Sequence, residues 1–270
     1  MIAAPFEYVR PDSVDDAVAL LAEHGNRARL LAGGQSLVPE LIARSTEASV
    51  LVDIGSLPWA SPSIRGATLT IEAGTTQADA AGQGCRILDA ALPWVGHAQT
   101  RNRGTVVGSL AQRDPLAEIP LAFVLAGGHV RVVGPEGTRA IDASRFVSGA
   151  EVVRDDELII ESVWNLGGSQ CGVAFDEVAG VGTVAAAAAI VDWSTMTAAL
   201  AVSGATTGPI RVDAPDGDPD RLITALEAET ATVEFIADAT SPSLHRRAVA
   251  LHLAERVVAL AQQRAEEGAQ

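Results

Sequence analysis

The beginning of the chain alternates strand and helix patterns, and this order constrains the fold more than any other feature of the sequence. Residues 29–32 form a short, mostly apolar strand that runs into Gly33-Gly34, and Ser36 is placed to cap the helix that follows. Residues 49–54 form a second apolar strand. Two neighbouring strands that are joined by a helix lie parallel in one sheet. The sequence therefore predicts that the chain begins with a small parallel β–α–β sheet.

The rest of the sequence contains strand and helix patterns that no longer alternate regularly. Further strands are predicted at residues 67–73, 129–133, 139–141, 157–164, 172–179, 183–191 and 196–203. Helices are predicted at residues 14–24, 77–81, 87–92, 115–126, 219–228 and 241–267, and long loops at residues 96–109 and 208–219. This arrangement is typical of an α+β fold rather than of a regular parallel α/β fold.

We therefore predict an α+β chain with two domains. Residues 1–168 form a two-lobed domain, with one lobe at about 1–55 and the other at about 56–168, around a mixed or antiparallel sheet. Residues 169–270 form a small C-terminal domain with a three-stranded sheet and helices. A ligand would lie in the cleft between the two lobes of the first domain.

The strongly acidic composition excludes several classes of partner. The formal net charge is −15, from 19 Lys and Arg against 34 Asp and Glu. Binding to nucleic acid or to an anionic membrane surface depends on clustered basic residues, so neither is expected. An anionic cofactor remains compatible with this charge, because backbone N–H groups can hold phosphate without charged side chains.

The cysteines and the apolar segments limit the sites and the location of the protein. Cys85 and Cys171 form no Cys-x-x-Cys pair, so we expect neither an iron–sulfur cluster nor a zinc site in this chain. A single disulfide between them stays open, but two reduced thiols are favoured. The N-terminus has no signal-peptide pattern, and no apolar run is long enough to span a membrane, so a cytoplasmic protein is expected.

Two glycine-bearing segments carry the functional prediction. The first, Ala32 to Ser36, lies between a strand and a helix, where adjacent glycines allow close approach of a ligand. The second, residues 96–109, places Arg-Asn-Arg before the turn Gly104-Thr-x-x-Gly-Ser, which combines side-chain donors with N–H groups and hydroxyls for phosphate. The first segment alone would indicate only a tight turn. The second could be a polar surface loop, although long ordered loops are usually functional.

Several motifs together resemble a known family. They are Ala-Gly-Gly-x-Ser-Leu at residues 32–37, Val-Asp-Ile-Gly at 52–55, Glu-Ala-Gly-Thr-Thr at 72–76, Gly-His-x-Gln-x-Arg-Asn-Arg-Gly-Thr at 96–105, Gly-Ser-Leu-Ala at 108–111 and Asp-Pro-x-Ala-Glu-x-Pro at 114–120. Over residues 5 to about 165 the sequence resembles the FAD-binding medium subunits of the xanthine dehydrogenase and carbon monoxide dehydrogenase family, the molybdenum hydroxylases.

The resemblance implies a PCMH-type FAD-binding domain, with the FAD pyrophosphate between residues 32–36 and 104–109. It places Thr75, Thr76 and Asp114 along the flavin, ribityl or phosphate groups, and Asp53 nearer the adenosine end. The cofactor-binding residues implied in this way are Ala32, Gly33, Gly34, Gln35, Ser36, Leu37, Asp53, Thr75, Thr76, Arg101, Asn102, Gly104, Thr105, Gly108, Ser109 and Asp114. No catalytic residue and no metal ligand is implied for this chain.

The same resemblance implies the partners and the role. A large molybdopterin subunit would oxidise the organic substrate, and a small subunit with [2Fe–2S] clusters would deliver electrons to this FAD subunit in an (αβγ)2 assembly. The subunit would then pass the electrons to an external acceptor. Two other interpretations stay open: a structural subunit that has lost FAD, and a standalone flavin oxidase, for which the C-terminal domain is too small to build a substrate pocket.

Three segments depart from the family pattern. Val107 stands where the family has the first glycine of Thr-Ile-Gly-Gly-Ser, and Gln112-Arg113 replaces the usual His-Ala. The C-terminal segment near the flavin is shortened to residues 179–183. Because a side chain at position 107 would force the loop outward or require a negative φ, these departures favour the structural-subunit interpretation.

Overall fold

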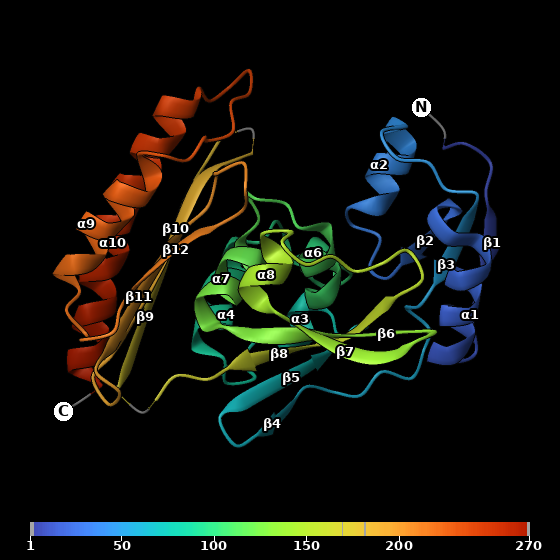
Figure 1. Ribbon diagram of the computed structural model, residues 1–270, viewed down its shortest axis with the longest axis horizontal. Helices are drawn as coiled ribbons and strands as arrows, with labels where there is room; N and C mark the ends of the chain where they lie inside the picture. Colours follow the sequence, from blue (N-terminus) through green and yellow to red (C-terminus); the bar gives the residue numbers. More distant parts are fainter. Residues whose placement is uncertain (1–2, 169, 181, 269–270) are drawn as a thin grey trace.

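A computed structural model describes residues 3–168, 170–180 and 182–268, and in it three β-sheets lie in a row from the N-terminal to the C-terminal part (Figure 1). The α+β fold class is confirmed. Ser169 and Val181, which belong to the predicted domain boundary and to the shortened 179–183 segment, lie outside the described residues.

The N-terminal lobe contains the predicted parallel sheet. It consists of β2 (Ala28–Leu31), α2 (Leu37–Ala43) and β3 (Val50–Asp53), and β1 (Glu7–Val9) is an additional strand on the other side of β3. Both strand pairs are parallel. The predicted helix is α1 (Val14–His24), where the Ser13 hydroxyl accepts the N–H of Asp16 at 3.0 Å. The predicted β–α–β unit is thus confirmed, while β1 was not predicted.

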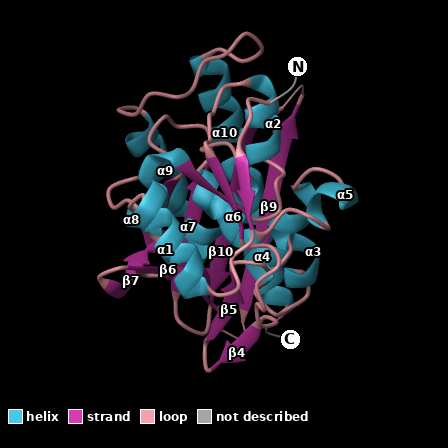
Figure 2. Ribbon diagram, turned by 90° about the vertical axis from the view of Figure 1, so that its right-hand side faces the viewer, coloured by secondary structure: helices cyan, strands magenta, loops and turns pink. Residues whose placement is uncertain are grey.

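The central sheet has five antiparallel strands. They are β4 (Ser63–Arg65), β5 (Thr68–Glu72), β6 (Gly128–Gly134), β7 (Gly137–Asp142) and β8 (Leu158–Asn165), in the order β4-β5-β8-β6-β7. The helices of this region are α3 (Gln77–Ala80), α4 (Arg86–Ala91), α5 (Ala98–Arg101), α6 (Val106–Gln112), α7 (Glu118–Ala126) and α8 (Ala143–Val147). The prediction of one long loop at residues 96–109 was wrong, because α5 and the first turns of α6 interrupt it; α5 lies at the edge of the molecule in Figure 2.

The C-terminal sheet has four antiparallel strands, not three. The predicted strands correspond to β9 (Cys171–Ala179), β10 (Thr183–Asp192) and β11 (Thr197–Val202), and β12 (Ile210–Ala214) pairs with β11 at the edge of the sheet. The sequence around β12 is rich in Pro, Asp and Gly, which led to the prediction of a loop at residues 208–219. An edge strand tolerates such flanking residues, because only one of its sides must pair.

Helices cover both faces of this C-terminal sheet. The predicted helices α9 (Asp220–Thr230) and α10 (Ser243–Glu267) lie on its outer face, and α4 and α7 lie on its inner face (Figure 1). Ala185 to Ala189 of β10 are fully buried, so small side chains face both helical layers. One hydrophobic core connects the inner face to the central sheet and the N-terminal lobe. The division into domains at residue 168 stays a prediction.

The buried face of α10 agrees only in part with the apolar spacing of the sequence, which predicts Leu244, Ala248, Leu251, Ala254, Val258 and Ala261 on one face. Ala254, Val258 and Ala261 are buried, but Leu244 is 80% exposed and Ala248 is also exposed. The fully buried residue of the first turns is instead Arg246. Apolar spacing identified the helix correctly. Its first turns, however, meet carbonyls of β10 and of the segment after α9, which need a hydrogen-bond donor rather than an apolar side chain.

The two thiols are reduced and buried. Cys85 and Cys171 are free cysteines, and burial raises the pKa of each thiol to about 11. The structure therefore supports the interpretation that the sequence favoured over a disulfide. Within the described part of the chain, no helix combines the length and the apolar character that crossing a bilayer requires.

Candidate functional site

The two glycine-bearing segments are in direct contact. A Cβ atom built on Gly33 would lie 2.0 Å from the carbonyl oxygen of Arg103 and 2.7 Å from the Cα of Gly104. No side chain can occupy such a space, so only glycine permits this approach. Gly34 has a φ of +71°, in the left-handed region that favours glycine. The sequence-based prediction that these loops lie together is borne out by this geometry.

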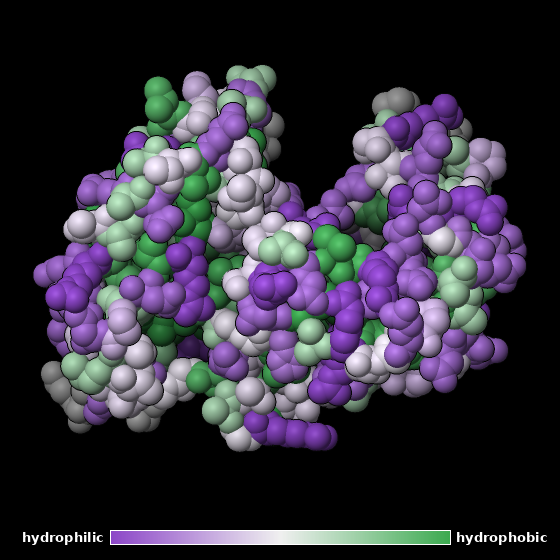
Figure 3. Space-filling view, in the orientation of Figure 1, coloured by the Kyte–Doolittle hydropathy of each residue, from purple (hydrophilic) through white to green (hydrophobic). Residues whose placement is uncertain are grey.

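A cavity of about 530 Å³ opens beside this contact, between the N-terminal lobe and the central part of the molecule. Figure 3 shows the surface hollowed there, in the orientation of Figure 1. Residues of both segments form its wall. Of the residues implied by the family resemblance, those that line the cavity are Ala32, Gly33, Gly34, Gln35, Ser36, Leu37, Gly104, Thr105, Gly108 and Ser109.

The second segment is held in place by the end of β5 and the residues after it. Thr105 is the N-cap of α6, and its hydroxyl accepts the N–H of Gly108 at 3.0 Å. The N–H of Gln77 donates to the Gly104 carbonyl at 2.8 Å, and the N–H of Val106 donates to the Thr75 carbonyl at 3.2 Å. These bonds fix the path of the second segment.

The remaining implied residues lie outside the cavity lining. Arg101 donates to the carbonyls of Val95 at 2.8 Å and Gly96 at 3.2 Å, so its guanidinium supports its own segment. Asn102 is the exposed C-cap of α5.

Asp53, Asp114 and Thr76, which also lie outside the cavity lining, make hydrogen bonds within the protein. Asp53 accepts the N–H of Gly55 at 2.9 Å and the hydroxyl of Tyr8, and Asp114 accepts the N–H of Leu116 at 2.9 Å. The Thr76 hydroxyl caps α3. Contact of Asp53, Asp114, Thr75, Thr76, Arg101 and Asn102 with FAD stays a prediction.

The structure adds cavity residues that the sequence did not single out as binding residues. The carboxylate of Glu40 on α2 accepts the Gln112 amide of α6 at 2.6 Å and the Thr46 hydroxyl at 3.1 Å, and all three residues line the cavity. The Glu40–Gln112 bond joins the two lobes across 72 residues of sequence. Ser36, in contrast, occupies the N-cap position of α2 but makes no capping bond through its side chain, so that part of the prediction was wrong.

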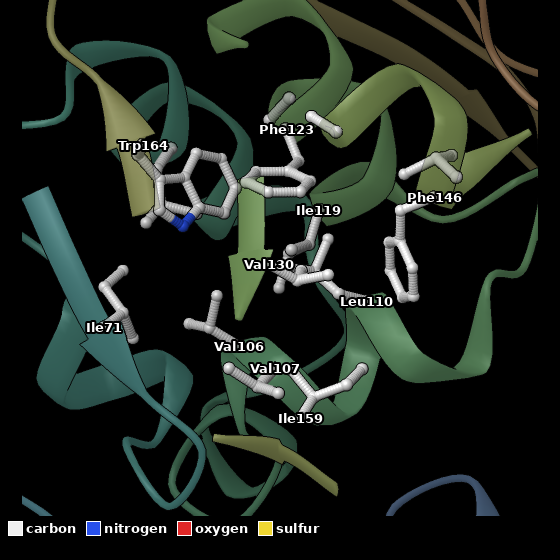
Figure 4. Close-up of a cluster of buried hydrophobic side chains, with 14 of the residues drawn as sticks. Ile71, Val106, Val107, Leu110, Ile119, Phe123, Val130, Phe146, Ile159 and Trp164 are labelled. Carbon is white, nitrogen blue, oxygen red and sulfur yellow. The ribbon is translucent and has the colours of Figure 1, made fainter. Parts of the chain in front are cut away.

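Val107 does not distort the second segment. It belongs to α6 and is only 4% exposed, and its φ is not positive. Figure 4 shows Val106, Val107 and Leu110 of α6 within the cluster of buried side chains. The position that the family fills with glycine is therefore an ordinary helical position here, and it gives the structural-subunit interpretation no support.

A comparison with known sequences identifies the family of the chain. Residues 4–164, more than half of the chain, match the family described as "FAD binding domain in molybdopterin dehydrogenase". The chain belongs to this family. The resemblance that the motifs indicated is thereby confirmed, together with FAD as the cofactor of this kind of domain.

Individual relatives and structures agree with this membership. The 6-hydroxypseudooxynicotine dehydrogenase complex subunit alpha of Paenarthrobacter nicotinovorans is 38% identical over 64% of this chain and 61% of that protein. The carbon monoxide dehydrogenase medium chain of Hydrogenophaga pseudoflava is 36% identical over 60% of this chain and 59% of that protein. These matches span less than two thirds of either relative.

The likeness to a solved structure extends over nearly the whole chain. The structure of the Hydrogenophaga pseudoflava carbon monoxide dehydrogenase that lacks the Mo-pyranopterin moiety of its molybdenum cofactor matches with a TM-score of 0.88 at 27% identity. The match covers 98% of this chain and 99% of that chain. The C-terminal part, which lies beyond the matched family domain, therefore also shares the fold of that structure.

The cavity suits FAD on two observations. The contact between Gly33 and Gly104 leaves main-chain atoms of both segments at the cavity wall, where no side chain can cover them. Thr75 and Gln77, respectively 6% and 5% exposed, each have a buried side-chain oxygen without a hydrogen-bond partner among the described residues. Such atoms cost free energy unless a ligand satisfies them, and FAD carries hydroxyl and N–H groups that can do so.

A pair of carboxyl groups lies where α7 meets β9. Burial, together with the charge of the neighbouring Glu177, raises the pKa of Glu118 from 4.5 to about 7. The Glu177 Oε1 accepts the Thr183 hydroxyl at 3.2 Å, whereas its Oε2 is buried without a donor among the described residues as long as Glu118 is ionised. A proton on Glu118 supplies that donor, so the pair is stable with one proton.

This pair makes stability depend on pH. Between about pH 4.5 and 7 the folded chain keeps the Glu118 proton that the unfolded chain releases, so the free energy of unfolding falls as the pH rises through this range. We expect Glu118→Gln to raise the free energy of unfolding by about 1–2 kcal/mol at about pH 8 and to leave it unchanged at about pH 4. Urea unfolding of the full chain at both pH values measures this. The exposed Glu255→Gln is the control, and parallel pH profiles of wild type and Glu118→Gln would contradict the assignment.

Proposed function

We propose that this chain is the electron-transferring FAD subunit of a molybdenum hydroxylase complex. The observation that supports it is the cavity between the lobes, whose wall is made by the two glycine-bearing segments in contact at Gly33 and Gly104. Residues 32–37 and 104–109 would hold the cofactor. When bound, FAD supplies the redox chemistry, and the protein supplies binding, orientation and electrostatics.

The partners follow from the same proposal. A large molybdopterin subunit oxidises the organic substrate, a small subunit carries [2Fe–2S] clusters, and the three subunits form an (αβγ)2 assembly in the cytoplasm. This subunit takes electrons from the clusters and passes them to an external acceptor. In support, both sequence relatives are by name a subunit or chain of a dehydrogenase. The described residues contain no group of His, Cys, Asp and Glu suited to a metal ion.

Purification of the chain co-expressed with its partner subunits tests the proposal. We expect the complex to carry one FAD per copy of this chain, seen as visible flavin absorbance after the protein is denatured, together with iron and molybdenum from the partners. A complex with iron and molybdenum but without flavin would overturn the proposal in favour of a structural subunit. A chain that binds FAD, forms no complex and oxidises an organic substrate by itself would favour a standalone oxidase.

A further inference from the structure

Gln77 lies in the wall of the candidate site, although no motif marked it. It is the first residue of α3, directly after Thr75-Thr76, and it lines the cavity. Its N–H donates to the Gly104 carbonyl at 2.8 Å. Its side-chain Nε2 lies 3.1 Å from the point where a Cβ of Gly104 would stand. Both the main chain and the side chain of Gln77 are thus packed against the segment that contacts Gly33.

The side chain of Gln77 is incompletely satisfied. Only 5% of the residue is exposed, and its Oε1 is buried with no donor within reach among the described residues. In folded proteins, a buried polar atom nearly always has a partner, because leaving it unmatched costs free energy. An amide that is fixed against the cavity wall and lacks one hydrogen bond therefore indicates a missing ligand group.

The Gln77 Oε1 is a hydrogen-bond acceptor, and this decides which kind of ligand group can pair with it. A carbonyl oxygen accepts hydrogen bonds and donates none, and phosphate oxygens are acceptors in the same way. The Gln77 Oε1 consequently cannot be satisfied by the diphosphate itself. It needs an O–H or N–H group, and in FAD the groups that flank the diphosphate are the hydroxyls of the ribityl chain on one side and of the ribose on the other.

We propose that Gln77 is a cofactor-positioning residue whose side-chain carbonyl accepts a hydrogen bond from a sugar hydroxyl next to the FAD diphosphate. This inference rests on the proposed function, since it requires FAD in the cavity. Gln77 fixes the sugar, and through its main-chain bond to Gly104 it also fixes the second glycine-bearing segment. The residue thereby sets the position of the cofactor relative to the turn at Gly104.

The proposal predicts that replacing Gln77 affects the stability of the flavin-free protein and its affinity for FAD differently. Gln77→Leu removes the unmatched acceptor and keeps a side chain of similar size, so the flavin-free chain should melt at the same or a higher temperature. FAD binding should weaken by about 5- to 10-fold, the loss of one hydrogen bond. A purely structural role would lower both the melting temperature and the affinity.

The experiment uses the full chain stripped of flavin. The melting temperature of the flavin-free protein and its affinity for FAD are measured for wild type, Gln77→Leu and the control Gln99→Leu, which changes an exposed glutamine in the neighbouring segment 96–105. Competition of FMN and of ADP against FAD then distinguishes the two sugars. If Gln77→Leu weakens the binding of FMN, the hydroxyl that Gln77 accepts from belongs to the ribityl chain. If it weakens the binding of ADP, that hydroxyl belongs to the ribose.

The outcomes separate this inference from the proposed function. Wild type that binds no FAD overturns both. If wild type and Gln77→Leu bind FAD equally tightly, only the role of Gln77 is overturned. The same conclusion follows if the variant loses both stability and affinity for FAD. Weaker FAD binding with unchanged affinity for both FMN and ADP would overturn the assignment to a sugar hydroxyl.

Discussion

Gly33→Ala is expected to abolish stable FAD binding, with a loss of affinity of about 100-fold or more. The added Cβ would stand 2.0 Å from the Arg103 carbonyl oxygen and 2.7 Å from the Cα of Gly104. Both are main-chain atoms of the second segment, so no side-chain rotation can relieve the clash. The two segments must separate, and the wall of the cavity separates with them.

The flavin content of the purified complex and the FAD affinity of the flavin-free chain measure this effect. Gly268→Ala, at the end of α10, is the matched control, because a Cβ there would lie 3.4 Å or more from its neighbours and the φ of Gly268 is −73°. A Gly33→Ala variant with wild-type flavin content would show that the contact between the two segments does not form the cofactor site.

Arg246→Ala is expected to destabilise the fold by about 3–5 kcal/mol. The guanidinium is 1% exposed and holds several carbonyls of the C-terminal part. It donates to the Ile236 carbonyl at 2.9 Å, to the Thr183 carbonyl at 3.0 Å and to the Val184 carbonyl, and it pairs with Asp238 at 2.6 Å. Removing it takes the guanidinium donor away from the three carbonyls, although Asp238 keeps its bonds from Thr240 and Ser241. Losing these buried bonds costs more than the loss of an exposed ion pair.

Denaturant unfolding compares this variant with Arg256→Ala on the same helix. Arg256 is 60% exposed and pairs with Asp176 at 2.9 Å, so its removal should cost less than about 1 kcal/mol. Equal unfolding midpoints for the two variants would contradict the role given to Arg246. At temperatures where Arg246→Ala remains folded, its FAD affinity should equal that of wild type, because Arg246 does not line the cavity.

Local signals in the sequence were sufficient for most of the fold and for the core of the site. The strand–helix–strand order of residues 29–54 has only one plausible arrangement, and Gly33 and Gly104 mark the places where two main chains approach each other. Four of the five strands of the central sheet were found because turns bound their apolar residues, whereas the short edge strand β4 was not predicted.

Features that depend on distant partners were not predictable in the same way. The strands β1 and β12 are short edge strands, which form because a neighbour offers an unpaired side, not because of their own composition. The burial of Arg246 depends on carbonyls of β10 and of the segment after α9. For Gln77 and the Glu40–Gln112 bond, only the assembled lobes show that these polar side chains share one cavity.

The cavity is bounded by two sheets that share no strand, and the Gly33–Gly104 contact and the Glu40–Gln112 bond lie at the place where they meet. A molecule held there contacts both lobes at once, so its binding free energy opposes any hinge opening between them. Loss of the flavin would then affect more than redox activity. Without the flavin, the N-terminal lobe would be attached mainly by its own packing. It would then be the part of the subunit most accessible to proteases and to quality control in the cell.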